Sequence, residues 1–520
     1  MTQRKRKLRA LVPLWLTAAL LLGLGVYAGR AQPAQDTANP IAEAAQISTE
    51  AQSGVLQPGE GSELPSPSMS AAQRARLAQE EARGGTLVER LISVLGMVVF
   101  VGIAWLFSAN RRAVPWRLVA WGVGLQFIFA ILILKTAPGL WLFDWLNTAF
   151  TNLLGYTGEG ARFLFGNLVL NNVPVGSAGG AMDTFTAQPA MWANTGAFFA
   201  FNVLPTIIFF SSLMTLLYHL GIMQFFVRLF AWVMYRTMGT SGAESLSSAG
   251  NIFLGQTEAP LLVKPFVKTM TKSELHCIMT GGFATVAGGV MAGYVGMLAA
   301  FFPNIAGHLI AASVMSAPAA LVFAKVLYPE TEEPETRGRM DIEIPKVDAN
   351  VIDAAARGAG EGLGLALNVA AMLLAFIALL ALLNGIIGGI GGWVGMPDLS
   401  IQMILGWIGA PFAWLMGTPW KDALEVGRLI GEKTALNEFV AYLHLAEALQ
   451  GGSNLSARAV VIATYALCGF ANFSSIAIQI GGIGGLAPER RGDLSRLGLR
   501  AMMAGTFASF MTACVVGVLM

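Results

Sequence analysis

The sequence Gly255-Gln256-Thr257-Glu258-Ala259-Pro260 interrupts an apolar segment with an amide, a hydroxyl and a carboxylate. The apolar stretches on either side are each too short to cross a membrane, so residues 245–267 are predicted to form a re-entrant helical hairpin. A partial echo of this tip, Leu436-Asn437-Glu438-Phe439, lies inside the apolar segment 423–445. The sequence therefore predicts two hairpins, each with a carboxylate at its tip.

Each hairpin is followed by a long apolar segment that carries a similar interruption. The first segment contains Gly282-Phe283-Ala284-Thr285, and the second contains Gly469-Phe470-Ala471-Asn472. Carboxylates inside a membrane are costly and usually mark a functional site. Paired, interrupted segments in two halves of a chain are typical of the binding site of a transporter with an inverted repeat.

The composition excludes an ordinary soluble protein. Hydrophobic residues make up 55% of the 520 residues, charged residues make up 12%, and the mean hydropathy is +0.61, whereas soluble domains carry about 25% charged residues. The net charge of +2 gives no indication of a nucleic-acid partner. The three cysteines lie in apolar runs, and the four histidines lack metal-ligand spacing, so we expect free thiols, no histidine–cysteine metal centre and no cofactor.

The predicted fold class is an all-α polytopic membrane protein with about eight transmembrane helices and two re-entrant hairpins in an inverted repeat. The expected spans are residues 91–107, 117–134, 197–217, 277–301, 305–327, 363–394, 459–486 and 501–520. Residues 141–165 and 399–420 mix Trp, Asp and Gly into amphipathic runs, and they are predicted to be interfacial helices.

The N-terminus predicts a targeting segment followed by a linker. A basic cluster precedes an apolar run within residues 1–31, which is typical of a signal peptide, and an uncleaved signal anchor is the alternative. Residues 32–90 are rich in Ala, Gln, Glu, Ser and Pro and are expected to be a disordered linker outside the cell. The remaining chain is divided into scaffold spans and interfacial helices (91–240), first hairpin and broken helix (241–300), scaffold spans with a cytoplasmic loop (301–420), and second hairpin, broken helix and last span (421–520).

Clusters of Lys and Arg orient these spans in the membrane. Arg111, Arg112, the loop between the fifth and sixth spans, and Arg490–Arg491 are expected to be cytoplasmic, because positive charge is retained on that side. The linker and the C-terminus are then external. We expect a multi-pass protein of the inner (plasma) membrane whose hairpins enter from opposite faces.

The two tip sequences, together with Gly469-Phe470-Ala471-Asn472-Phe473-Ser474-Ser475, resemble the concentrative nucleoside transporter family from about residue 91 to the C-terminus. The resemblance implies a homotrimer in which each protomer has a scaffold domain and a mobile transport domain that contains both hairpins. It also implies that the third and sixth spans, 197–217 and 363–394, form the interface between protomers.

The resemblance also assigns eight residues to the nucleoside. The nucleobase site is matched by three polar residues of the first tip and two apolar residues, namely Gln256, Thr257, Glu258, Val290 and Phe470. The ribose site is matched by three polar residues, namely Glu438, Asn472 and Ser475. Three simpler interpretations stay open at this point. The polar tip residues could satisfy open helix ends, Phe470 could serve only in packing, and Ser475 could bond to its own helix.

The same resemblance assigns Asn251, Leu254, Thr285 and Val286 to a sodium site. Side-chain and backbone oxygens at helix breaks suit a hard monovalent cation. Some family members are coupled to protons, but the oxygen ligands in this sequence favour sodium as the coupling ion.

The predicted function is therefore a symporter that imports nucleosides, driven by a sodium gradient, with nucleoside, sodium and the lipid bilayer as its partners. A proton-coupled symporter and a channel-like permease for related small polar solutes are the alternatives. No catalytic residues are expected, because no nucleophile–base arrangement, metal cluster or phosphate loop is present in the sequence. The preference for purines or pyrimidines and the ion stoichiometry are not predicted.

Overall fold

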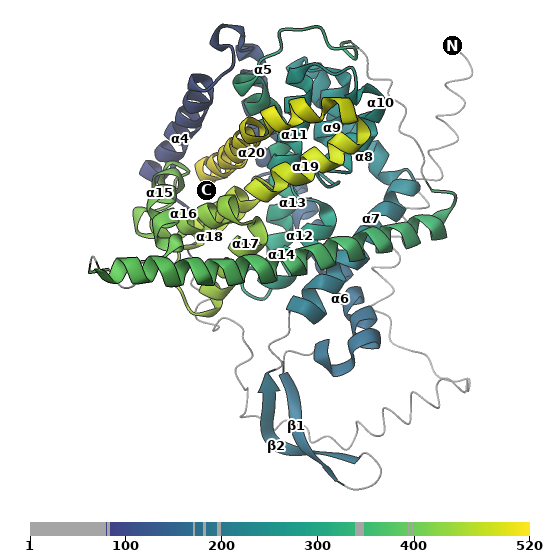
Figure 1. Ribbon diagram of the computed structural model, residues 1–520, viewed down its shortest axis with the longest axis vertical. Coiled ribbons are helices and arrows are strands. Elements are labelled where there is room, and N and C mark those ends of the chain that lie inside the picture. Colours follow the sequence, from purple (N-terminus) through teal and green to yellow (C-terminus); the bar gives the residue numbers. More distant parts are fainter. Residues whose placement is uncertain are drawn as a thin grey trace. The chain divides into compact units, whose positions relative to one another are not determined.

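A computed structural model describes residue 80 and residues 84–169, 172–179, 184–194, 199–338, 348–393, 395–396 and 399–520. The predicted signal segment and residues 32–79 of the predicted linker lie outside the described residues. Within this part of the chain the secondary structure is almost entirely helical (Figure 1).

The outer helices carry apolar side chains that face away from the protein. In the segments that contain α4, α5, α7 and α14, only between 22% and 33% of the membrane-length stretch is buried. Such faces fit a lipid environment, where exposed Leu and Ile carry no penalty. This outer set comprises α4 (Leu87–Leu106), α5 (Trp116–Leu134), α6 (Ala137–Phe165), α7 (Leu204–His219), α8 (Ile222–Met238) and α14 (Val351–Trp393). The long helix α14 packs along α7.

The inner helices are rich in small residues, and four of them are the short halves of two broken helices. The stretch that spans α11 and α12 is 94% buried, and so is that of α13. Gly, Ala and Ser let the backbones of neighbouring helices approach closely, so these segments form the packed centre of the fold. The inner set comprises α11 (Lys272–Ala284), α12 (Gly288–Leu298), α13 (Ile305–Leu327), α18 (Ala457–Leu467), α19 (Phe473–Leu486) and α20 (Arg491–Leu519).

Two hairpins carry the tips that the sequence indicates. The first is built from α9 (Gly242–Gly250), then η5 (Ala259–Val263) and α10 (Lys264–Val267). The second is built from α16 (Trp420–Ala435) and α17 (Glu438–Gln450), and α15 (Ile401–Leu415) meets α16 at 119°. The N-terminus of α9 is closed by a capping box between Ser241 and Glu244, and that of α17 by the side chain of Asn437.

The predicted all-α polytopic class is confirmed. By length and composition, seven helical segments of the described residues could cross a membrane, one of them formed by α11 and α12 together. The predicted span 459–486 is formed by the two shorter helices α18 and α19. One described feature was not predicted. Strands β1 (Asn172–Gly179) and β2 (Thr184–Asn194) pair in an antiparallel hairpin between α6 and α7 (Figure 1).

Candidate functional site

The two broken helices meet at the centre of the fold. Helix α11 ends at Ala284 and α12 begins at Gly288, while α18 ends at Leu467 and α19 begins at Phe473. Gly469 lies in the second break with φ +118°, and a Cβ atom there would lie 2.6 Å from the carbonyl oxygen of Phe283. Glycine alone readily adopts this backbone conformation and permits this approach, so Gly469 brings the second break against the end of α11.

A cavity of about 680 Å³ lies between the two hairpin tips and helix α14. All eight residues that the sequence analysis assigned to substrate line this one cavity: Gln256, Thr257, Glu258, Val290, Glu438, Phe470, Asn472 and Ser475. Segments from both halves of the chain, up to 219 residues apart for Gln256 and Ser475, thus contribute to a single binding surface.

Glu438 lies at the centre of a buried polar group in this cavity. Its side chain is 3% exposed, and its two oxygens accept hydrogen bonds of 2.9 Å from the Tyr294 hydroxyl and of 2.9 Å from the Asn472 amide. The Asn472 oxygen accepts in turn from the backbone N–H of Ser475 (2.9 Å), which fixes the orientation of its amide. A carboxylate offers about four acceptor positions, so Glu438 keeps acceptor capacity for a ligand.

The tip of the first hairpin contacts the second broken helix. The Gln256 amide nitrogen donates to the Ser475 hydroxyl (3.3 Å), and its oxygen accepts from Gln479 (3.0 Å). Gln479, which the sequence analysis did not select, also donates to the carbonyl oxygen of Met279 (3.1 Å) and so ties α19 to α11. Gln479 follows Ser475 by four residues, which places both on one face of α19. This spacing could have indicated Gln479 as a residue of the site.

Helix α14 supplies a wall of the cavity that was not predicted. Arg357, Glu361, Asn368 and Met372 line it, and their spacing of four, seven and four residues places them on one helical face. These side chains come from an outer helix, whereas the eight predicted residues come from the hairpins and the inner helices. The cavity is therefore bounded by two different groups of helices.

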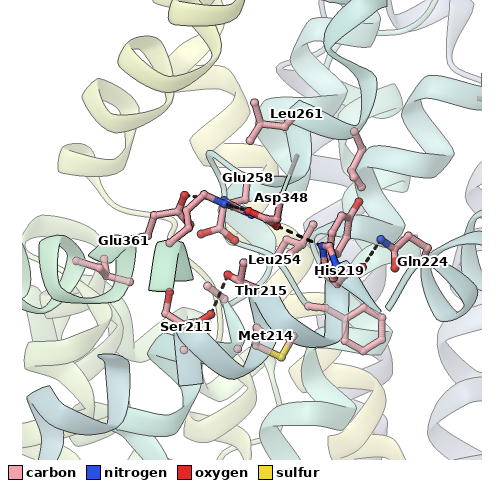
Figure 2. A pocket seen from close by; sticks show the side chains of 18 residues that line it. Ser211, Met214, Thr215, His219, Gln224, Leu254, Glu258, Leu261, Asp348 and Glu361 are labelled. Atoms are coloured by element: carbon pink, nitrogen blue, oxygen red, sulfur yellow. Dashed lines mark hydrogen bonds and ion pairs between the residues drawn. The ribbon is translucent and has the colours of Figure 1, made fainter. Parts of the chain in front are cut away.

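Figure 2 shows a smaller pocket of about 120 Å³. Glu258, Arg357 and Glu361 line both this pocket and the cavity, so the two adjoin. The Arg357 guanidinium donates to both oxygens of Asp348 (2.6 and 2.9 Å) and to Glu361 (2.7 Å). The hydrogen bond from Arg357 holds the pKa of the Asp348 carboxyl below its ordinary value. This ion-pair cluster joins the segment before α14 to the wall of the cavity.

The four residues assigned to sodium surround the first helix break. Asn251 caps the end of α9 and is fully buried, and its amide nitrogen lies 2.8 Å from the position that a Cβ atom of Gly281 would take. The Thr285 hydroxyl donates to the carbonyl oxygen of Gly281 (3.0 Å), so Asn251 and Thr285 approach the same residue of α11. Leu254 and Val286 flank them in the chain.

These residues fit a bound sodium ion. The Asn251 side-chain oxygen and the Ser247 hydroxyl are buried without a hydrogen-bond partner among the described residues. An unpaired buried acceptor costs roughly 1–3 kcal/mol, and a hard cation bound between such oxygens would remove that cost.

Family models match most of the described chain. Residues 95–168 match the model of the Na+-dependent nucleoside transporter N-terminus, and residues 308–517 match the model of the corresponding C-terminus. Between them, residues 200–301, which include the first hairpin, match a model described as nucleoside recognition.

Several proteins are similar to this chain over most of its length. An uncharacterized transporter of Haemophilus influenzae is 46% identical, over 82% of this chain and 97% of its own length. Solute carrier family 28 member 3 of mouse and sodium/nucleoside cotransporter 1 of rat are each 43% identical over 83% of this chain. The chain spans only 59% and 64% of the lengths of these two mammalian relatives.

The fold is also similar to that of a solved transporter. The structure of CNTnw in an inward-facing, substrate-bound state matches with a TM-score of 0.72 at 42% identity, and the match covers 82% of this chain and 97% of that one.

Proposed function

Because this chain belongs to the concentrative nucleoside transporter family, a family of membrane transporters and not of enzymes, we propose that it imports nucleosides by symport with sodium. The sodium gradient across the membrane is the energy source. Two of the matching family models are described as Na+-dependent nucleoside transporter, and the rat relative as a sodium/nucleoside cotransporter. Sodium coupling, the symport mechanism and the inward direction are the proposed extension to this chain.

One observation carries the proposal: both hairpin tips line the same cavity with complementary polar groups. The first tip offers the Gln256 amide, which can donate and accept and so suits the polar edge of a nucleobase. The second half offers the Glu438–Asn472 pair, which can bond to the hydroxyls of a ribose. Val290 and Phe470 give the base an apolar wall.

Sodium coupling is supported by the proximity of the ion site to the first tip. Asn251 and Leu254 directly precede Gly255-Gln256-Thr257-Glu258, so a cation held at the helix break would order the tip residues that contact the base. An ion that orders the tip strengthens nucleoside binding, and by linkage nucleoside strengthens ion binding by the same factor. This reciprocity would couple the two gradients.

The proposed orientation in the inner membrane has the C-terminus and the start of α4 outside. The Gly85 amide donates to the carbonyl oxygen of Met520 (2.8 Å), so both lie on one side of the membrane. On the other side, the Ala109 amide donates to the carbonyl oxygen of Leu327 (2.9 Å), next to Arg111. Positive charge near this second side supports its assignment to the cytoplasm.

A homotrimer with α7 and α14 at its interface is supported by the surface of α14. Its exposed apolar residues include Leu374, which is 78% exposed, and a Cβ atom at Gly385 or Gly389 would meet open space. A neighbouring protomer could approach closely along such a face.

Uridine binding by the purified protein tests this proposal. Isothermal titration in sodium chloride should give a one-site uridine isotherm, and replacing sodium by choline at equal ionic strength should weaken binding by about tenfold or more, the range of typical linkage energies. Equal affinity in both salts would reject sodium coupling. Absence of uridine binding in either salt would reject the nucleoside site.

A further inference from the structure

Lys433 places a charged side chain in the interior of the second hairpin. It lies in α16 and is 1% exposed. Its ammonium donates to the carbonyl oxygen of Ala466 (2.9 Å) and to the Ser509 hydroxyl (3.5 Å). Both partners are neutral oxygens, and among the described residues no carboxylate lies within 4.0 Å of the ammonium. The Glu438 carboxylate acts on this charge only from a longer distance. A buried charge held directly by neutral oxygens alone is costly, which points to a specific use of this side chain.

The oxygens that Lys433 contacts belong to the second helix break. The last carbonyl groups of a helix have no donor within the helix. At the end of α18 these groups accept from side chains instead. The Tyr442 hydroxyl donates to Thr464 (2.8 Å), Lys433 donates to Ala466, and the Ser509 hydroxyl donates to Cys468 (2.7 Å). The break therefore presents a group of backbone oxygens to which Lys433 brings a positive charge.

Both hairpins carry a buried polar side chain near the end of their first helix, an asparagine in the first repeat and a lysine in the second. Asn251 is the C-cap of α9, seven residues before Glu258, and Lys433 lies in the last turn of α16, five residues before Glu438. At the first break, the buried Asn251 oxygen has no partner among the described residues. At the second break, the Lys433 ammonium of the same hairpin helix contacts the carbonyl oxygen of Ala466.

We propose that the Lys433 ammonium is a built-in cation that takes, at the second helix break, the place that the coupling ion takes at the first. Its role is to position the break between α18 and α19, and with it Asn472 and Glu438, without touching the substrate. Only the first break then needs an ion from solution. This inference rests on the proposed function, because the first site must bind the coupling ion.

Two variants of Lys433 test the inference by uridine titration of the purified protein in saturating sodium. Lys433→Gln keeps hydrogen-bonding groups near Ala466 and Ser509 but removes the charge. Lys433→Ala leaves space for a small cation. Both should bind uridine about tenfold or more weakly, because the carbonyl oxygen at the end of α18 loses its hydrogen bond to a charged group, and a bond of this kind contributes a factor of that size. Lys421→Ala, at an exposed position of the same helix, is the matched control and should bind as the wild type does.

Chemical rescue separates a built-in cation from a merely structural side chain. Methylammonium chloride should restore uridine binding by Lys433→Ala to within about threefold of the wild type, and choline chloride at equal concentration should not, since only the small cation fits the vacated volume. Wild-type affinity in Lys433→Gln would overturn the inference. Weak binding by Lys433→Ala that methylammonium does not improve would overturn it as well. Failure of the wild type to bind uridine would instead reject the proposed function.

Discussion

Replacing Glu438 by Gln should weaken binding of uridine while leaving binding of uracil nearly unchanged. Glu438 is 3% exposed and already accepts from Tyr294 and Asn472, both at 2.9 Å. Gln has nearly the same volume, so the cavity keeps its shape. It exchanges one acceptor oxygen for an NH2 group, which would point at one of these two donors, and it removes the negative charge.

The expected magnitude follows from the hydrogen bond to the sugar. A hydrogen bond to a charged group contributes roughly 1.5–3 kcal/mol. Since about 1.4 kcal/mol is a tenfold change in affinity, uridine should bind Glu438→Gln roughly 10- to 100-fold more weakly. Tyr294→Phe is the matched control. It removes one donor to the same carboxylate but keeps the charge and the acceptor positions for the sugar, so we expect a smaller loss of roughly 2- to 10-fold.

Competition against radiolabelled uridine gives the affinities of uridine, uracil, 2′-deoxyuridine and 3′-deoxyuridine for each variant. The deoxynucleoside that lacks the hydroxyl bound by Glu438 should bind the wild type and Glu438→Gln about equally. If Glu438→Gln weakened uracil as much as uridine, or weakened neither, the carboxylate would not contact the ribose. The assignment of Glu438 and Asn472 to the sugar would then be wrong.

Three further predictions concern the ion, the base and the N-terminal segment. Thr285→Val keeps the shape of the side chain but removes an oxygen at the first break, so the sodium concentration for half-maximal uridine uptake should rise at least about threefold, with a parallel rise in uridine Kd. Thr280→Val, in the same helix, should change neither quantity, and equal effects of both variants would argue against a sodium ligand at 285. Gln256→Ala should alter the ratio of affinities for uridine, cytidine and adenosine, and an unchanged ratio would remove Gln256 from base recognition. Deletion of residues 33–79 keeps Glu80, which accepts a hydrogen bond from the Ala457 amide (3.1 Å). Uridine uptake, divided by the amount of protein in the membrane, should stay near the wild-type value. Loss of uptake at normal membrane levels would contradict a dispensable linker.

The sequence predicted the hairpins and the inner helices because their signals are local. Polar groups such as Glu258 and Glu438 are so costly in an apolar segment that their positions alone indicate re-entrant tips. The second Gly-Phe-Ala lies at a break, where Gly469 adopts a backbone conformation that other residues avoid, and the first ends α11 at Ala284. All eight predicted substrate residues line one cavity, while their individual roles stay predictions.

Other parts of the site depend on packing between distant segments, which leaves a weaker trace in the sequence. The predicted sixth span began at residue 363, whereas α14 begins at Val351, because Arg357 and Glu361 interrupt the apolar pattern. Both side chains line the cavity. The two polar residues that interrupted the apolar pattern, and so led to a predicted start that was too late, therefore belong to the site. Gln479 was missed for a related reason: its partners, Gln256 and the Met279 carbonyl, lie at least 200 residues away.

The central claim is sodium-driven accumulation of nucleoside, and uptake of radiolabelled uridine into proteoliposomes tests it most directly. The same purified protein is reconstituted and given an inward sodium gradient, an inward proton gradient, both gradients or neither. We predict accumulation of unmodified uridine above the external concentration only when the sodium gradient is present, with loss of accumulation after a sodium ionophore and persistence after a proton ionophore. Accumulation driven by the proton gradient in sodium-free buffer, or mere equilibration of uridine under all four conditions, would contradict the account.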